Sequence, residues 1–156
     1  MLGNPDDLSF EPFAREVQAA AVTIGRHIEL LTARTSREID TAFADLVQKG
    51  RADAALVAPH GLFVNRRVQL VTLAARHAVP AIYATKEFTE IGGLMSYGAS
   101  PTDQWRLTGV YVGRVLNGEK PADLPILRAT KLEFVINLQT AKTLPADAAR
   151  PRRRGD

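Results

Sequence analysis

The chain has 156 residues, of which 46% are hydrophobic and 24% are charged, and it contains no cysteine. These values are ordinary for one globular domain and exclude a collagen-like chain, a disulfide framework, a thiolate nucleophile and cysteine-ligated zinc. The net charge is +3, but four arginines lie in the last seven residues, so the body of the chain is close to neutral and nucleic acid is not an expected partner.

The first part of the chain predicts a helix followed by a strand. Apolar residues at helical spacing follow Ser9, which is the expected N-cap, and Asp6 and Asp7 are expected to help cap the same helix. The helix is expected to end near Gly25. The short apolar segment 27–32 then predicts a strand.

The next segments repeat this alternation. A capping box at 35–38 starts a second helix, for which Gly50 is the expected stop. A strand is expected at 54–58, a helix at 65–76 and a strand at 80–83. Strands that recur about every 26 residues with a helix between them are typical of a parallel α/β sheet.

The rhythm changes after this point. A polar connector leads to a further short strand at 94–97, and a long helix with proline at its first position is expected at 100–116. An extended linker then leads to a last strand at 131–137. Asn137 is expected to cap a short helix that runs to Leu144.

Five segments carry a resemblance to a known family: NPDD at 4–7, PAIY at 80–83, GGLMSYG at 92–98, GEKPADLP at 118–125 and KLEFVINLQTAK at 131–142. They resemble the C-terminal half of ABC transporter substrate-binding proteins of the tryptophan/tyrosine type, which have a periplasmic-binding-protein-like type I fold. The resemblance extends over nearly all of residues 1–144.

The resemblance implies a fold and a division of the chain. The expected fold is an α/β lobe of parallel βαβ units with flavodoxin-like strand order, truncated at its first strand. Only Met1 and Leu2 remain of that strand, so its two neighbours are expected to have unpaired edges. The expected division is 1–98 and 131–144 as the C-terminal lobe, 99–130 as a helix and linker that pack on an absent N-terminal lobe, and 145–156 as a disordered basic tail.

The resemblance also implies a function without chemistry. A two-lobed protein of this kind closes on a small organic solute, such as an amino acid or an aromatic metabolite, and delivers it to an ABC transporter permease. No cofactor is expected, and the full-length family is periplasmic, whereas this chain begins without a signal peptide and as given would be cytoplasmic. The apolar stripe of the 100–116 helix predicts a homodimer in the absence of its lobe.

Ligands of parallel α/β sheets bind beyond the carboxyl ends of the strands, and several aromatic and polar residues fall there in this sequence. The expected ligand-binding residues are Asn4, Ser36, His60, Phe63, Tyr83, Thr85, Ser96 and Tyr97. Phe63 and Phe88 are equally well explained as loop anchors that pack on helices. At His60–Gly61 the resembled family has an Asp-Pro step, so the contacts of that loop differ here.

Other chemistries find little support in the sequence. The three histidines lack the spacing of a metal site, the serines lack the pattern of a hydrolase, and Gly92–Gly93 precedes a strand instead of a helix, which is the wrong order for a phosphate loop. The alternatives to a solute-binding lobe are a truncated fragment without activity and an enzyme on a doubly wound fold.

Overall fold

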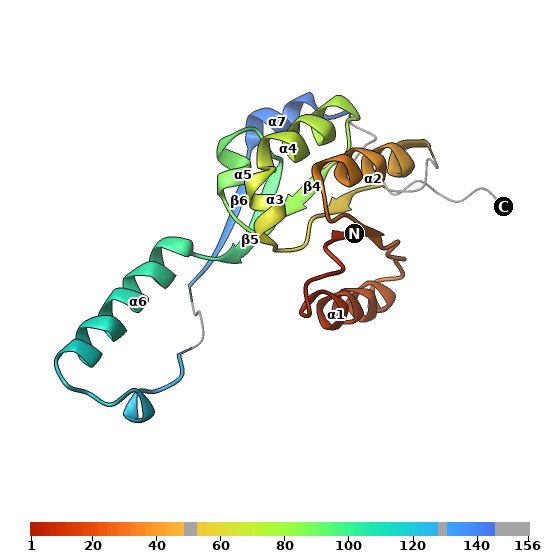
Figure 1. Cartoon of the computed structure of the whole chain (residues 1–156). Coiled ribbons are helices and arrows are strands. Elements are labelled where there is room, and N and C mark those ends of the chain that lie inside the picture. The colour runs from red at the N-terminus through yellow and green to blue at the C-terminus, as the bar shows by residue number, and fades with distance from the viewer. Residues whose placement is uncertain (49–52, 128–130, 146–156) are drawn as a thin grey trace.

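The structure is a computed structural model that describes residues 1–48, 53–127 and 131–145 (Figure 1). The predicted helix stop at Gly50 and almost all of the predicted basic tail lie outside the described residues. The described chain forms an α/β lobe from which one long helix and the loop after it project as an arm.

The lobe contains six short strands, which are β1 (Leu2–Gly3), β2 (Leu31–Thr32), β3 (Ala55–Leu56), β4 (Ala81–Tyr83), β5 (Met95–Ala99) and β6 (Leu132–Ile136). Leu2 forms a parallel bridge with Val57, which joins the β2–β1 pair to the sheet β3–β4–β5–β6. The strand order is therefore β2–β1–β3–β4–β5–β6, with β6 antiparallel to β5 and the other strands parallel. The predicted α/β fold with flavodoxin-like order is confirmed.

The expectation that the neighbours of the first strand have unpaired edges is wrong. The carbonyl groups of Met1 and Gly3 accept hydrogen bonds from Leu31 and Ala33 at 2.8 and 3.0 Å, and the Leu2 carbonyl accepts one from Ala58 at 2.9 Å. Successive carbonyl groups of a strand point to opposite sides. Three residues are therefore enough to bond β2 on one side and the β3 segment on the other.

The described helices are α1 (Phe10–Thr23), α2 (Ser36–Gln48), α3 (Gly61–Asn65), α4 (Arg67–Arg76), α5 (Glu87–Glu90), α6 (Pro101–Leu116) and α7 (Leu138–Thr143), with a 3-10 turn at Pro121–Asp123. The predicted strand at 27–32 shrinks to its last two residues. The helix expected from Asn65 begins earlier, as α3, and the polar connector after β4 contains α5.

The cap of α1 also differs from the prediction. Ser9 has helical backbone angles and makes no capping bond with its side chain. The Asp7 carboxylate instead accepts hydrogen bonds from the Ser9 backbone N–H at 2.9 Å and from the Ser9 hydroxyl at 2.7 Å. Asp7, which was expected to assist, is thus the residue that holds this turn.

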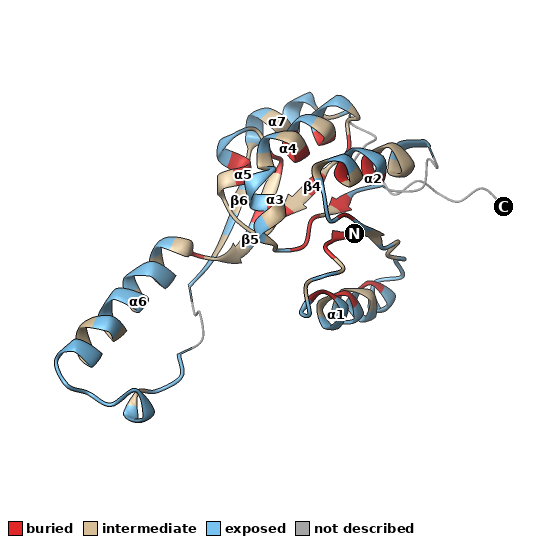
Figure 2. Cartoon of the chain, viewed as in Figure 1, coloured by how far each residue is buried: buried red, intermediate tan, exposed pale blue. Residues whose placement is uncertain are grey.

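Two apolar clusters fill the two faces of the sheet. The larger lies between the sheet and α2, α3, α4 and α5, and Ile39, Phe43, Phe63, Leu70 and Tyr83 are among its members. The smaller contains Met1, Phe10, Ala14 and Ala58 and lies under α1 (Figure 2). Helices therefore cover both faces around β1 and β3.

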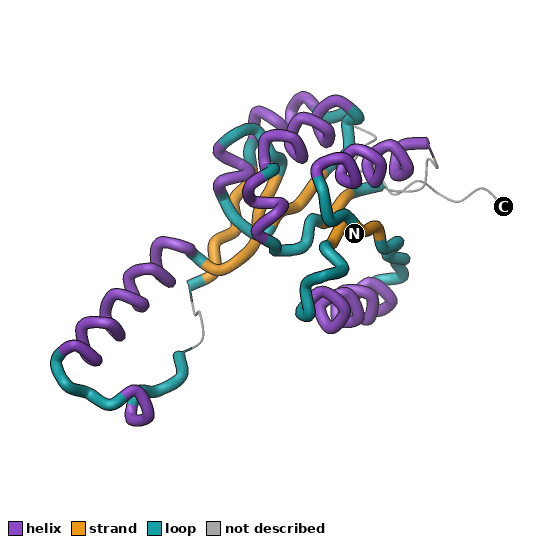
Figure 3. Tube along the Cα trace, in the orientation of Figure 1, coloured by secondary structure: helices purple, strands orange, loops and turns teal. Residues whose placement is uncertain are grey.

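The arm consists of α6 and the segment after it, and Figure 3 shows it extending away from the strands. No residue of α6 is buried, and Trp105 and Leu116 are 75% and 80% exposed. The arm leaves and re-enters the lobe at one place, where the Ser100 N–H donates to the Lys131 carbonyl at 2.9 Å. Among the described residues, no helix is both long enough and apolar enough to cross a membrane.

Candidate functional site

The strand order locates the crevice of this lobe. In a doubly wound sheet the ligand crevice opens where the order reverses, which here is between β1 and β3. The loops that follow these two strands begin with Asn4 and with Pro59–His60. The Asn4 amide nitrogen lies 3.5 Å from His60 Nδ1, so the structure brings two of the predicted site residues together across this point.

The local structure sets the chemistry of His60. It is the N-cap of α3, and its Nδ1 accepts a hydrogen bond from the Leu62 N–H at 3.1 Å. Because Nδ1 is an acceptor there, the ring proton is assigned to Nε2. The ring of buried Phe63 packs edge-on against the His60 ring, with the two ring centroids 5.8 Å apart. His60 is therefore a held, half-exposed imidazole that can offer its Nε2–H as a donor.

The loop after β1 is held by its own side chains. The carboxamide oxygen of buried Asn4 accepts a hydrogen bond from the Asp6 N–H at 2.9 Å. Asp6 in turn forms an ion pair with Arg34, whose Nε lies 3.0 Å from a carboxylate oxygen. Arg34 follows β2, so this pair joins the loops after β1 and β2. Sequence reasoning missed the pair, although the position of Arg34 just beyond a predicted strand is a signal for it.

Ser36 lies at the start of α2 and is engaged with α4. Its hydroxyl donates to Gln69 Oε1 at 2.7 Å, and the Gln69 amide donates to the Ser36 carbonyl at 2.9 Å and to Asp40 at 2.8 Å. The predicted capping box is confirmed at the same helix end, where the Glu38 N–H donates to the Thr35 hydroxyl at 3.2 Å. Ser36 therefore fixes the start of α2 against α4.

Three other predicted site residues lie inside the lobe. Tyr83 is 2% exposed and stacks on Phe88 with ring centroids 4.4 Å apart, and both Phe63 and Ser96 are buried. Burial raises the pKa of the Tyr83 hydroxyl above its usual value. Thr85 is half-buried, and its hydroxyl next to Glu87 holds the pKa of that carboxyl below its usual value. Tyr83 and Ser96 are thus core residues of β4 and β5 and are not exposed to a solute.

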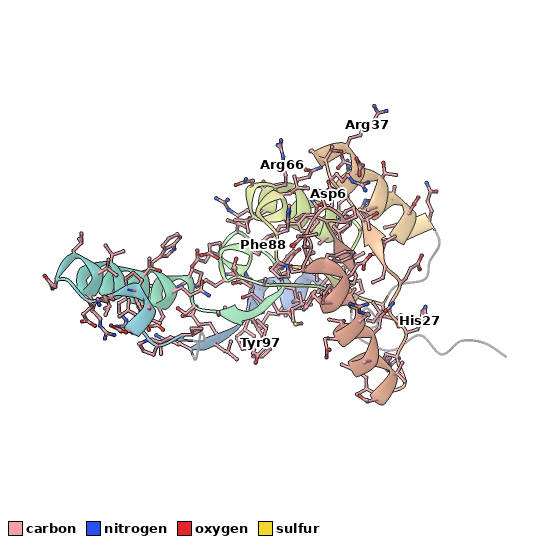
Figure 4. The ribbon with its side chains drawn as sticks, turned by 60° about the horizontal axis from the view of Figure 1, so that its bottom comes forward. Asp6, His27, Arg37, Arg66, Phe88 and Tyr97 are labelled. Carbon is pink, nitrogen blue, oxygen red and sulfur yellow. The ribbon has the colours of Figure 1, made fainter. Side chains whose placement is uncertain are left out.

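Tyr97 lies on the other face of the sheet. Successive side chains of a strand point to opposite faces, and Ser96 pairs with Tyr83 on the α5 side. Tyr97 is 54% exposed and packs edge-on against Phe134 of β6. Figure 4 shows Tyr97 and Phe88 on opposite sides of the ribbon. The structure therefore separates Tyr97 from Asn4 and His60, which follow strands on the other side of β4.

The described residues form no metal-binding site. Among them, no group of three or more histidine, aspartate or glutamate side chains is placed to hold a metal ion. The groups at the switch point are instead the carboxamide of Asn4 and the imidazole of His60, and the loop after β1 also carries Asp6, which is paired with the Arg34 guanidinium. Such groups can orient a small polar molecule through hydrogen bonds.

Comparison with known proteins decides the family. Residues 1–147 match the family model described as ABC transporter substrate binding protein. The chain belongs to this family. The predicted resemblance is therefore confirmed, and the family is one of transporter binding proteins, not of enzymes.

Solved structures show the same fold. An ABC domain from Streptococcus pneumoniae in complex with L-Trp is 23% identical with a TM-score of 0.80. A conserved domain protein from Vibrio cholerae is 21% identical with a TM-score of 0.81. A substrate-binding protein with adhesive properties from Clostridium difficile, in its ligand-free, open form, is 22% identical with a TM-score of 0.64. No curated protein matches the sequence significantly.

The extent of these matches is uneven. Each match covers 94% of this chain but only 51 or 52% of the chain in the solved structure. The chain therefore spans about half the length of the structures that it resembles, and that half corresponds to the lobe and arm described above.

Proposed function

We propose that this chain supplies one solute-binding lobe of the substrate-binding component of an ABC uptake transporter, with the solute held beyond the carboxyl ends of β1 and β3. The observation that carries the proposal is the family match over residues 1–147 together with the Asn4–His60 contact at the switch point. The lobe binds and releases its solute without chemical change.

The proposed solute is a small organic molecule with a carboxylate, such as an amino acid or an aromatic metabolite. The Nε2–H of His60 and the exposed face of the Arg34 guanidinium offer donors to a carboxylate, and the N-terminus of α2 favours negative charge nearby. The similar Streptococcus pneumoniae domain was solved with L-Trp, which makes L-Trp the first compound to test.

The predicted site residues have different roles in this proposal. We assign Asn4, Ser36 and His60 to the polar rim, whereas Thr85, whose hydroxyl oxygen is buried, belongs with Phe63, Tyr83 and Ser96 to the interior of the lobe. Tyr97 lies on the other face of β5, packed against Phe134, so we assign it no contact in this rim.

We propose the division of the chain that the family resemblance predicts. Residues 1–98 and 131–144 form the lobe, and 99–130 pack on a second lobe, so that the solute lies between the two. The uncovered apolar side chains of α6, such as Trp105, support this reading. A permease partner and a site of action outside the cytoplasm belong to the proposal. The homodimer through residues 100–116 stays an untested prediction from the sequence, in which α6 of another copy takes the place of the second lobe as the cover of this helix.

The test is solution NMR of the chain titrated with L-Trp, L-Tyr and a non-aromatic amino acid. With one lobe only, an affinity near about 1 mM, or about 4 kcal/mol, is expected. The amide signals of Asn4 and His60–Leu62 are expected to shift. His60→Ala is expected to abolish these shifts, because it removes the Nε2 donor.

His27→Ala is the matched control for this experiment. His27 is exposed and precedes β2, so it lies toward the amino ends of the strands, away from the crevice, and Figure 4 shows it well apart from Asp6. The same ligand-induced shifts are expected in this variant. Shifts confined to other parts of the lobe, or none with any of the three compounds at several millimolar, would show that the crevice is not a solute site.

A further inference from the structure

Strand β6 is the outer strand of the sheet, and one of its edges is bare. It follows β5 in the strand order, and the described residues place no strand beyond it. Figure 1 shows β6 on the side of the lobe away from α1. An uncovered edge strand presents a row of backbone donors and acceptors that can pair with another strand.

The register shows which backbone groups face outward. The Asn137 N–H donates to the Leu94 carbonyl at 2.8 Å, and the Ser100 N–H donates to the Lys131 carbonyl at 2.9 Å. Hydrogen-bonded pairs alternate along an antiparallel ladder, so Glu133 and Val135 also face β5. The N–H and C=O groups of Leu132, Phe134 and Ile136 therefore point away from the sheet.

The same strand carries an exposed apolar face. The side chains of Leu132, Phe134 and Ile136 are 54%, 59% and 44% exposed, and they share the face of the sheet with Tyr97. Natural edge strands are usually protected by lysine, proline or a bulge, and residues 132–136 contain none of these. The only charge, Glu133, lies on the opposite face within 3.9 Å of Lys86.

We propose that β6 pairs with β6 of a second copy of this chain, antiparallel about a two-fold axis through Phe134. In this register Phe134 faces its own copy and Leu132 faces Ile136, so each outward backbone group meets a partner. Glu133 would lie opposite Val135 of the other copy, so no like charges meet within the strand. The two sheets would become one continuous sheet.

The exposed area fits an interface between two copies. At about half exposure of roughly 200 Å² each, the side chains of Leu132, Phe134 and Ile136 offer about 300 Å² of apolar surface per copy beside the paired backbone. Interfaces are about 57% apolar, so this corresponds to about 500 Å² per partner, or about 1,000 Å² in total, which is the lower limit for a specific interface. The β6 edge is therefore large enough for a weak dimer.

The test is the mass of the full chain in solution, measured by sedimentation equilibrium at about 100 μM. The expected result is a particle of twice the 17.0 kDa chain mass. Phe134→Pro removes one outward N–H and leaves the bonds of Glu133 and Val135 to β5 in place. Phe134→Lys keeps that N–H and places like charges on the two-fold axis. Each variant is expected to weaken dimerisation at least tenfold.

Trp105→Lys in α6 is the control, and it is expected to leave the dimer intact. Circular dichroism of each variant checks that the lobe is folded, and the lysine variant decides the question if the proline variant unfolds. A wild-type chain that is monomeric at this concentration would overturn the proposal. So would a dimer that survives both Phe134 substitutions, or one that only the Trp105 substitution dissociates, which would place the contact on α6. None of these outcomes depends on solute binding.

Discussion

The hydroxyl of Tyr83 is a buried polar group without a hydrogen-bond partner among the described residues. Burying such a group costs about 1–3 kcal/mol, and the stacked Phe88 ring already fills the space around the aromatic ring. We therefore expect Tyr83→Phe to raise the free energy of unfolding by about 1 kcal/mol, measured by urea denaturation.

Tyr111→Phe is the matched control for this substitution. The Tyr111 hydroxyl donates to the Pro125 carbonyl at 2.6 Å within the exposed arm, so its removal is expected to change the stability of the lobe by less than about 0.5 kcal/mol. A loss of stability in Tyr83→Phe would mean that the Tyr83 hydroxyl has a hydrogen-bond partner in the folded chain and would contradict this expectation.

Gly98 allows two strands to approach where the chain leaves the lobe. A Cβ atom at this position would lie 2.0 Å from the Ala84 carbonyl oxygen, which is backbone and cannot rotate away. We expect Gly98→Ala to lower the free energy of unfolding by about 1–3 kcal/mol. Gly109→Ala, in exposed α6 with no atom within 4 Å of the new Cβ, is expected to leave the lobe unaffected. Equal effects of the two substitutions in thermal unfolding would contradict this explanation.

At the scale of the element, α6 differs from the other long helices because no residue in it is buried. A helix of 16 residues that contains Gly109 and Gly113 is marginal without tertiary packing. Helix α2, in contrast, buries Ile39 and Phe43. We expect amide hydrogen exchange in α6 of the isolated chain to be at least about 100-fold faster than in α2.

Protection of α6 equal to that of α2 would contradict this expectation and would show that a second chain covers the helix. Mass spectrometry of peptic fragments, at two protein concentrations, separates an intrinsic protection from one that depends on association. The β6 dimer proposed above leaves α6 uncovered, so it predicts fast exchange at both concentrations.

At the scale of the whole molecule, the described residues of the arm leave and re-enter the lobe at one place (Figure 1). Ser100 and Lys131 are hydrogen-bonded to each other at the base of the arm, so a short turn can replace everything between them. We expect replacement of residues 101–130 by a two-residue Gly-containing turn to change the melting temperature of the lobe by less than about 3 °C. A much larger fall in the melting temperature would mean that the arm packs on the lobe in solution.

Residues 1–3, which are β1 and the residue before it, join the two parts of the sheet. Leu2 bonds the β3 segment while Met1 and Gly3 bond the β2 segment, and the ring of Phe10 packs where a side chain at Gly3 would lie. Truncation of Leu2 to alanine is expected to cost about 2–5 kcal/mol in urea denaturation, because it opens a cavity in the centre of the larger core. The matched Leu8→Ala substitution, at an exposed position, is expected to cost less than about 0.5 kcal/mol.

Local patterns in the sequence were sufficient for the elements that depend on local physics. The alternation of buried strands and amphipathic helices, the capping box at Thr35 and the Asn137 cap of α7 all follow from side chains close in sequence, and all are found in the structure. The family motifs added the strand order. Only the tertiary structure decided that β1 pairs on both sides, that Asn4 meets His60 and that Tyr97 faces away from them. The first two depend on which strands become neighbours in the sheet. The third depends on strand register, because a shift of one residue moves a side chain to the opposite face of the sheet. The exposed row on β6 has the same origin, since a strand is an edge only by virtue of what lies beside it.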